Sequence, residues 1–182
     1  MKQGRIVVIT GAPGTGKTTT AAIVAKESVM ERSVHMHTDD FYHYLSKGAI
    51  PPHLPESDEQ NLVVIEAFLA AAKRYARGGY DVIVDGIIGP WFLTPWLNTV
   101  KEGYAVHYII LRAGKEETMK RAMERAKLDR KTNMELVEVM WAQFHNLGIY
   151  EQNVIDTTTL SITDTVCAVK EKIANQTFLL RR

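Results

Sequence analysis

The chain has 182 residues, of which 46% are hydrophobic, and its 22 Lys and Arg nearly balance its 21 Asp and Glu. This composition excludes a disordered chain and gives no support to a polybasic nucleic-acid binder or a membrane-surface protein. The single cysteine, Cys167, excludes an intrachain disulfide. No apolar run approaches the roughly 18 residues that span a bilayer, and no signal peptide fits the first residues. We therefore expect one cytoplasmic domain over residues 1–182.

Segments with strand and helix patterns alternate along the chain. Short β-branched or alternating runs predict strands at residues 5–10, 34–38, 81–85, 105–111 and 154–156. Apolar residues at helical spacing predict helices at 17–31, 58–77, 90–100, 115–127, 132–147 and 162–174, and a shorter helix beginning at Phe41. This alternation predicts an α/β fold of three layers (α/β/α) with a mainly parallel, five-stranded sheet.

Two tetrapeptides have the spacing of a capping box, Ser57-Asp58-Glu59-Gln60 and Thr132-Asn133-Met134-Glu135. In a capping box the first hydroxyl accepts a hydrogen bond from the backbone of the helix that it begins. We therefore expect Ser57 and Thr132 to cap the helices that follow them.

The strongest functional signal follows the first predicted strand and matches the phosphate-binding pattern G-x-x-x-x-G-K-[ST]. It consists of Gly11, Ala12, Pro13, Gly14, Thr15, Gly16, Lys17 and Thr18, with Thr19 directly behind it. Glycines let successive backbone N–H groups converge on a phosphate, and the helix that follows adds its positive dipole end. Lys17 can reach the β- and γ-phosphates, and the Thr18 hydroxyl can bind Mg²⁺. The sequence therefore predicts a site for ATP and Mg²⁺.

A carboxylate at the end of the third predicted strand is a candidate for the metal side of this site. Asp85 closes the run Val82-Ile83-Val84-Asp85, which would place it beside the phosphate loop. An Asp that ends a strand is also a common turn residue, and this alternative stays open. With the loop present we favour the role at the metal.

Among the proteins that carry this loop, the sequence disfavours two classes. A switch GTPase needs a guanine-reading N/T-K-x-D, and the nearest string, residues 126–129, has Ala at its first position and lies in a predicted helix. Oligomeric and transporter ATPases need more than 182 residues. A phosphotransferase remains, with one alternative of another class: an ATP-binding regulatory protein that hydrolyses slowly and has no acceptor.

Taken together, the loop at 11–18, the pair Asp39-Asp40, the 82–85 run and Arg121-x-x-x-Arg125 resemble the P-loop kinase superfamily. This group includes nucleoside monophosphate kinases, shikimate and gluconate kinases, chloramphenicol phosphotransferase and the kinase half of polynucleotide kinase. The resemblance implies the strand order 2-3-1-4-5 and a helical lid at about residues 113–133. It also implies an acceptor site between the second and third strands.

The resemblance also assigns roles around Asp39. Residues 37–42 are similar to the segment of polynucleotide kinase that holds the catalytic base, so Asp39 would accept the proton of the acceptor hydroxyl, and Asp40 would orient substrate or cap a helix. The position agrees with the general rule that ligands of open α/β sheets bind beyond the carboxyl ends of the strands. The alternative is that both aspartates only begin the helix that follows.

In this family, arginines of the lid neutralise charge on the transferring phosphoryl group. By that resemblance Arg121 and Arg125, four residues apart on one helix face, are the candidates, with Arg112 and Arg130 as further ones. The alternative is a solvated helix face on which these arginines pair with neighbouring glutamates.

The segment expected to contact the acceptor, residues 41–60, contains no arginine and only Lys47 as a cation. Phosphate recognition usually uses arginine forks, so we favour a neutral or hydroxylated small molecule as acceptor. A nucleoside monophosphate kinase of the cytidylate or adenylate type is the alternative, and a nucleic acid is disfavoured. A monomer and a homodimer both stay open.

Two smaller patterns near the acceptor site are ambiguous. His35 and His37 lie on one side of a strand, but with no third ligand in view we do not expect a metal site there. Trp91, Phe92 and Trp96 follow the third strand and fit either an acceptor wall or the core.

Overall fold

The computed structural model describes residues 3–128 and 134–181. Its centre is a five-stranded sheet in which all neighbouring strands are parallel, in the order β2-β3-β1-β4-β5. The strands are β1 (Arg5–Thr10), β2 (Ser33–His37), β3 (Asp81–Gly86), β4 (Val106–Arg112) and β5 (Val154–Asp156). The predicted fold class, the strand order and the parallel sheet are confirmed.

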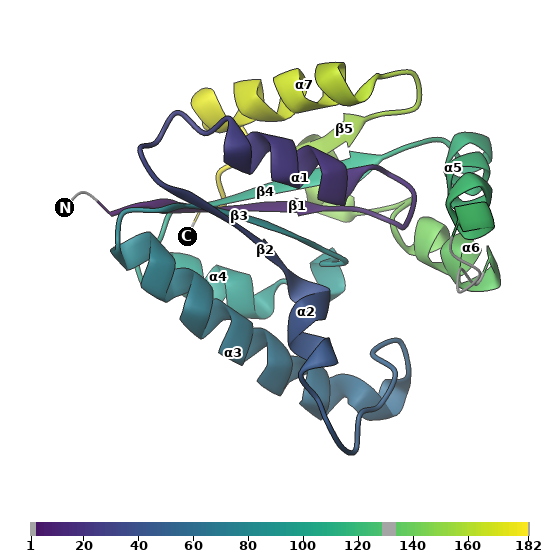
Figure 1. Ribbon diagram of the computed structural model, residues 1–182, viewed down its shortest axis with the longest axis horizontal. Coiled ribbons are helices and arrows are strands. Elements are labelled where there is room, and N and C mark those ends of the chain that lie inside the picture. Colours follow the sequence, from purple (N-terminus) through teal and green to yellow (C-terminus); the bar gives the residue numbers. More distant parts are fainter. Residues whose placement is uncertain (1–2, 129–133, 182) are drawn as a thin grey trace.

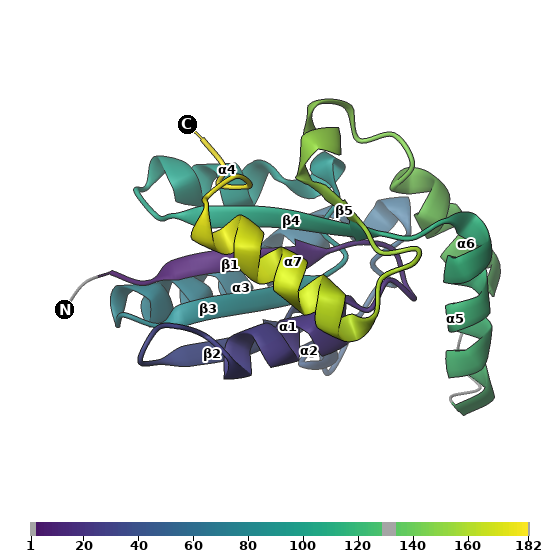
Figure 2. The ribbon, with the colours of Figure 1, turned by 90° about the horizontal axis from the view of Figure 1, so that it is seen from above.

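Helices cover both faces of the sheet, as Figures 1 and 2 show. One face carries α1 (Lys17–Lys26) and α7 (Ile162–Ala174), and the other carries α3 (Asp58–Arg77) and α4 (Thr94–Lys101). At the carboxyl edge of the sheet lie α2 (Thr38–His43), α5 (Lys115–Leu128) and α6 (Met134–Gln143). Three short 3₁₀ turns complete the fold: η1 (Pro55–Ser57), η2 (Pro90–Phe92) and η3 (Gly148–Asn153).

The central strands are buried on both faces, which explains their nearly continuous runs of Val and Ile. In β1, Ile6 and Val8 pack into the core under α3 and α4, whereas Val7 and Ile9 pack into the core under α1 and α7. All four side chains are fully buried. Two cores thus fix the sheet, and with it the edge where the strands end.

The C-terminal residues, which show no clear sequence pattern, extend the sheet at the amino end of β4. The Tyr108 amide donates to the Phe178 carbonyl at 2.9 Å, and the Leu180 amide donates to the Val106 carbonyl at 2.8 Å. His107 and Leu179 form the antiparallel bridge between these bonds. The tail therefore covers backbone groups of β4 that would otherwise lie at an open edge.

Some predicted boundaries are wrong for identifiable reasons. The first helix ends at Lys26 rather than at residue 31, because the Ser28 hydroxyl accepts from the Met30 amide and donates to Asp81, which turns the chain toward β2. Ser57 does not cap α3: its hydroxyl donates to the Pro52 and Leu54 carbonyls and so holds the preceding loop.

The remaining boundary differences are smaller. The helix that we expected from Phe41 begins at Thr38, and α6 ends at Gln143. The capping box at 132–135 lies largely outside the described residues. In the described part of the chain, no helix is both long enough and apolar enough to cross a membrane.

Candidate active site

The phosphate loop connects β1 to α1, at the carboxyl edge of the sheet. Gly11, Gly14 and Gly16 have positive φ angles of 149°, 84° and 84°, which side chains on L-residues rarely allow. The Thr15 hydroxyl donates to the Ala12 carbonyl at 2.9 Å, and the Lys17 ammonium lies 3.4 Å from the same oxygen. Because the loop is closed by these contacts, its backbone holds the curved form that a phosphate requires.

Two glycines permit close approaches that position the site. A Cβ on Gly14 would lie 3.0 Å from the Thr118 carbonyl, so the loop packs against α5. A Cβ on Gly86 would lie 1.9 Å from the Thr38 hydroxyl, which leaves no room for any side chain there. Gly86, at the end of β3, thus lets the start of α2, and Asp39 with it, sit against the sheet.

Asp85 lies fully buried beneath the loop and accepts three short hydrogen bonds. The Thr18 hydroxyl donates to its Oδ2 at 2.6 Å, His35 Nε2 donates to its Oδ1 at 2.6 Å, and His37 Nδ1 donates to its Oδ2 at 2.9 Å. Burial raises the pKa of Asp85, but the bonds from His35, His37 and Thr18 together outweigh it and lower the pKa well below its usual value. Asp85 is therefore a carboxylate.

His37 joins Asp85 to Asp39. Its Nδ1 contacts Asp85, and its Nε2 lies 3.3 Å from Asp39 Oδ2. The bonds to Asp39 and then to Asp85 raise the pKa of His37 to about 10, so both ring nitrogens carry protons and donate. The same bond from His37 lowers the pKa of Asp39. A continuous chain of polar contacts thus runs from Thr18 through Asp85 and His37 to Asp39.

The donor set at Thr18 and Asp85 suits a magnesium ion. The hydroxyl of Thr18, which directly follows the lysine of the phosphate loop, lies 2.6 Å from the Asp85 carboxylate. Hydroxyl and carboxylate oxygens are the ligands that Mg²⁺ takes beside nucleotide phosphates. The residues present therefore fit the ion. His35 and His37 are donors to Asp85, and no group of three or more His, Cys, Asp or Glu among the described residues is arranged to hold a metal by itself.

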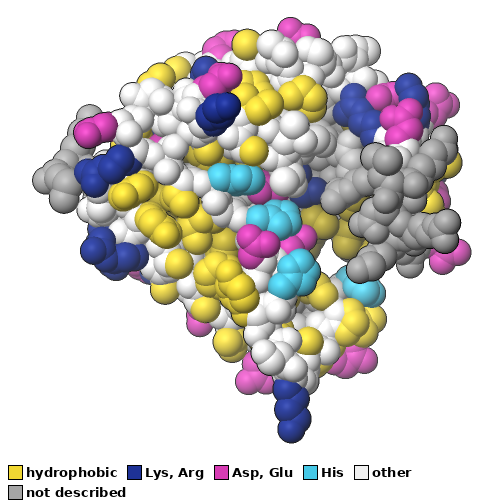
Figure 3. Space-filling model, in the orientation of Figure 1, with side chains coloured by type: hydrophobic (Ala, Val, Ile, Leu, Met, Phe, Trp, Pro, Cys, Tyr) yellow, Lys and Arg dark blue, Asp and Glu magenta, His cyan; other side chains and the backbone are white. Residues whose placement is uncertain are grey.

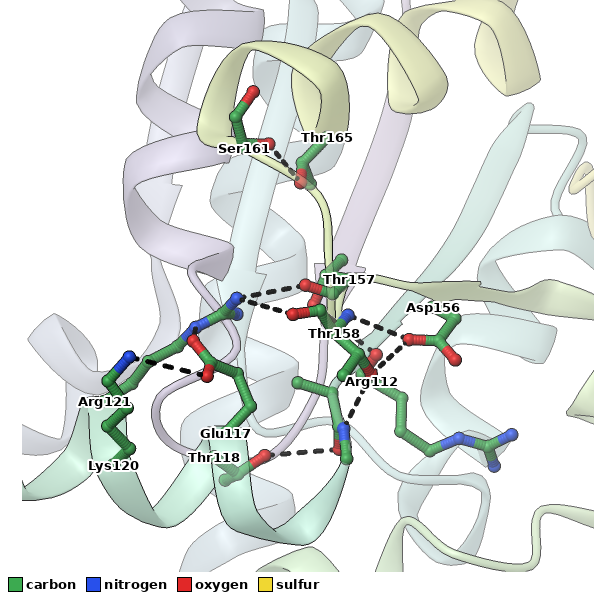
Figure 4. Close-up of polar contacts among 12 residues, drawn as sticks. Arg112, Glu117, Thr118, Lys120, Arg121, Asp156, Thr157, Thr158, Ser161 and Thr165 are labelled. Carbon is green, nitrogen blue, oxygen red and sulfur yellow. Dashed lines mark hydrogen bonds and ion pairs between the residues drawn. The ribbon is translucent and has the colours of Figure 1, made fainter.

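Arg121 lies beside the phosphate loop but binds protein groups there. Figure 4 shows its guanidinium between Glu117 and the loop that follows β5. Its Nε donates to Glu117 at 2.8 Å, and its Nη2 donates to the Thr157 carbonyl at 3.0 Å. The arrangement fixes α5 against the 157–158 loop. The side chain of Arg125 lies outside the described residues, as does Arg130.

Arg112, a further candidate for the lid, points to the opposite side in Figure 4. Its guanidinium donates to the Phe144 and His145 carbonyls and pairs with Glu151 at 3.0 Å. Its contacts thus connect the end of β4 to the segment that precedes η3 and to η3 itself. Asp40, the second member of the aspartate pair, is exposed.

A cavity of about 870 Å³ opens next to Asp39. Three segments line it: α2 with the proline-rich loop and the start of α3, the residues that follow β3, and one face of α6. On the face that Figure 3 shows, histidine and acidic side chains gather beside a hollow that hydrophobic side chains border. The lining residues include Thr38, Asp39, Tyr42, Pro51, Pro52, Leu54, Asp58, Ile87, Ile88, Trp91, Phe92, Leu136, Val139, Met140 and Gln143.

The inner wall of the cavity is held by hydrogen bonds to the backbone of Ile88. Its amide donates to the hydroxyl of Thr10, at the end of the central strand β1, at 2.8 Å. Its carbonyl accepts from the Tyr108 hydroxyl at 2.7 Å. Trp91 and Phe92, which follow, line the cavity, whereas Trp96 is fully buried against Phe68. Of the three aromatic residues, Trp91 and Phe92 thus belong to the cavity wall and Trp96 belongs to the core.

Two features of the site were missed by the sequence reasoning. The first is the pair His35 and His37, which was set aside when no third metal ligand was found. The signal that could have found it is the strand register, since His37 pairs with Asp85 across the sheet. The second is the contribution of α6 to the cavity, for which the sequence holds no signal, because it depends on how α6 folds back toward the residues after β3.

This fold, with a phosphate loop after its first strand and a cavity at the end of its second, defines a P-loop kinase. The chain belongs to the AAA domain family AAA_18, whose model matches residues 7–140. It is 31% identical over 180 residues to a cytidylate kinase of Pyrobaculum neutrophilum, with 88% of each chain covered.

Solved structures show the same fold. One is the crystal structure of APE1195, with a TM-score of 0.70 and 22% identity over 96% of this chain and 97% of that one. Another is the APS kinase CysC of Mycobacterium tuberculosis in complex with AMPPNP and APS, with a TM-score of 0.69 and 14% identity over 96% of this chain and 99% of that one. ATP binding, which the loop predicts, is what this family implies for the chain.

Proposed function

We propose that this protein transfers the γ-phosphoryl group of ATP, with Mg²⁺, to a small-molecule acceptor bound in the cavity beside Asp39. The observation that carries the proposal is the chain of contacts from Thr18 through Asp85 and His37 to Asp39. It ties the residue expected at the metal to the residue expected at the acceptor. Such a connection, with a cavity at its end, favours a phosphotransferase over an ATP-binding protein without an acceptor.

At the nucleotide end, the residues 11–19 would hold the triphosphate with backbone N–H groups and the Lys17 ammonium. Thr18 and Asp85 would hold Mg²⁺, which when bound neutralises charge on the β- and γ-phosphates. His35 and His37 fix both oxygens of Asp85, so the carboxylate stays in one orientation. Arg121 and Arg125 of the lid at about residues 113–133 remain our candidates for charge neutralisation at the transferring group.

At the acceptor end, Asp39 would orient the nucleophile. Its low pKa makes it a weak base, but phosphoryl transfer through a loose transition state needs alignment of the nucleophile more than it needs a strong base. The hydroxyl proton of the acceptor would hydrogen-bond to Asp39 and pass to it late in the reaction. His37 would hold Asp39 in place from the other side.

A second candidate function is nucleoside monophosphate kinase, because the curated relatives at about 30% identity are named cytidylate kinases. The two candidates differ only in the acceptor. A coupled assay of ADP release with MgATP, over a panel of hydroxyl compounds and nucleoside monophosphates, tests both. We expect at least one acceptor to raise ADP release far above the rate with water. Tight ATP binding with no such acceptor would instead support a regulatory ATP-binding protein.

A further inference from the structure

We propose that the acceptor carries its reactive hydroxyl on an apolar, uncharged body, and that the cavity beside Asp39 rejects acceptors bearing phosphate or carboxylate. This inference rests on the proposed function, since it assigns the substrate class of the same cavity. It separates this chain from the cytidylate kinases that it resembles in sequence.

The described lining of the cavity holds two carboxylates and two histidines, His43 and His53, but no lysine or arginine. The two carboxylates are those of Asp39 and Asp58. A phosphorylated acceptor would therefore bring its negative charge toward two carboxylates with no guanidinium to receive it. Such a site disfavours an anion through both repulsion and the loss of water around the anion.

The sequence segments that supply the walls of the cavity contain one lysine and no arginine. Residues 38–65, 87–92 and 136–143, which supply the lining, contain Lys47 and no other lysine or arginine. Lys47 is exposed and does not line the cavity. A phosphate bound at this place would therefore meet no lysine or arginine among the described lining residues.

The apolar part of the cavity is well suited to a hydrophobic body. Trp91 and Val139 come from two different segments of the lining and are each 55% exposed, and Leu54 is 38% exposed. Large apolar side chains exposed around one hollow are typical of a surface that is covered when a ligand binds. Trp91 is held in place by Phe144, with the ring centroids 5.2 Å apart. This contact packs the Trp91 ring against the buried Phe144 side chain.

The polar end of the cavity fixes where the reactive group must lie. Thr38, Asp39 and Tyr42 are among its lining residues, and Asp39 is connected through His37 to Asp85. The acceptor oxygen attacks the γ-phosphorus, the bond from that phosphorus to the β–γ bridging oxygen breaks, and ADP leaves. The hydroxyl proton passes to Asp39. An alcohol that lies with its hydroxyl at Asp39 and its apolar body toward Trp91 satisfies both ends.

A ladder of simple alcohols tests the inference without knowledge of the natural acceptor. ADP release with MgATP is measured for 1-butanol, 1-hexanol and 1-octanol, for 8-hydroxyoctanoate, and for CMP. We expect kcat/KM to rise about fourfold for each added methylene. We expect 8-hydroxyoctanoate to fall at least about tenfold below 1-octanol, because of its carboxylate, and CMP to stay at the rate with water. A flat series, or a higher kcat/KM for CMP or 8-hydroxyoctanoate than for 1-octanol, overturns the inference.

Two matched arginine variants place the effect in the cavity. Val139→Arg adds a cation to the lining, whereas Val63→Arg adds one on α3 at a residue that is 61% exposed and does not line the cavity. We expect Val139→Arg to lower kcat/KM for 1-octanol at least about tenfold and to give measurable binding of CMP. Val63→Arg should change neither. Equal effects of the two variants would contradict the inference.

A binding measurement separates this inference from the proposed function. Calorimetry of the wild-type protein with Mg²⁺ and AMPPNP is repeated with 1-octanol and with CMP. If no compound raises ADP release, the proposed function fails, and the calorimetry still decides the substrate class. Heat with 1-octanol and none with CMP supports an apolar site, and tighter binding of CMP overturns it.

Discussion

The phosphate loop and the cavity beside Asp39 share one edge of the sheet but are built from opposite kinds of contact. Around the loop, short hydrogen bonds fix nearly every group: Thr18, His35 and His37 all donate to Asp85. In the cavity, apolar side chains such as Trp91 and Val139 stay exposed. We therefore expect the nucleotide site to be specified by polar groups in fixed positions, and the proposed acceptor site by shape and by the lack of lysine and arginine among its described lining residues.

The largest expected effect lies at the loop. Lys17→Ala removes the side-chain cation expected at the β- and γ-phosphates, and we expect it to lower kcat at least about 10³-fold. The control is Lys26→Ala, which removes an exposed lysine from the last turn of the same helix. Steady-state ADP release checks both. If Lys17→Ala kept more than a tenth of the activity, the proposed role of the phosphate loop in the reaction would be contradicted.

The next effect lies where the two regions meet. Asp39→Asn keeps the shape of the side chain but removes the charge, so we expect kcat to fall about 10²- to 10³-fold while ATP affinity stays within about twofold. The matched control is Asp40→Asn, because Asp40 is the next residue in the chain and does not line the cavity. Turnover and calorimetry with Mg²⁺ and AMPPNP give the two quantities. An equal loss of ATP affinity in Asp39→Asn would move Asp39 to the nucleotide site.

A smaller effect, confined to the acceptor, is expected for the cavity wall. Trp91→Ala removes apolar surface, so KM for the acceptor should rise about tenfold while KM for ATP is unchanged. Tyr44→Ala serves as its control, because Tyr44 is 72% exposed and does not line the cavity. Equal changes in the two KM values would show that the two regions are not separate.

The fold and the nucleotide half of the site were predictable because their signals are local. Residues 11–18 are consecutive, the alternating strand and helix patterns predict the parallel sheet, and the resemblance to P-loop kinases implies the strand order. The chain of polar contacts from Thr18 to Asp39 was not predictable, because it joins side chains of α1, β3, β2 and α2 that only the sheet register brings together. The same applies to Gly86, whose need for a hydrogen in place of a side chain appears only when Thr38 packs on it.

The acceptor half was predictable only in its charge. The lack of arginine in residues 41–60 agrees with the described lining of the cavity, which has no lysine or arginine. The third wall, from α6, follows no pattern in the sequence. The pairing of Arg121 with Glu117 is one of the two alternatives that the sequence left open, whereas its second contact was not predictable from its helix face. Its guanidinium binds the Thr157 carbonyl, a contact to a loop 36 residues away.

The smallest effect on activity is expected at His107, which lies at the amino end of β4, away from both regions, and is 2% exposed. Burial, with the nearby charge of Arg5, lowers the pKa of His107 from 6.5 to about 4. The folded protein therefore favours neutral His107, so its contribution to stability is complete above pH 6.5 and is lost as the pH falls toward 4.

The variant His107→Gln removes this titration and should leave ADP release at neutral pH unchanged. Between pH 6.5 and 4 the wild-type protein should lose up to about 3 kcal/mol of unfolding free energy relative to the variant. Urea unfolding at a series of pH values measures the difference. A difference that does not change with pH would show that His107 titrates alike in the folded and unfolded chains.

The central claim, that the loop and the cavity form one phosphotransferase site, is tested most directly by following the γ-phosphoryl group itself. In a single turnover with ATP labelled at the γ-phosphate, and with protein in excess, the label is traced with and without 1-octanol. We expect the label to appear on the alcohol and Asp39→Asn to suppress this transfer. Label that appears only as inorganic phosphate, at the same rate with every acceptor tried, would contradict the account.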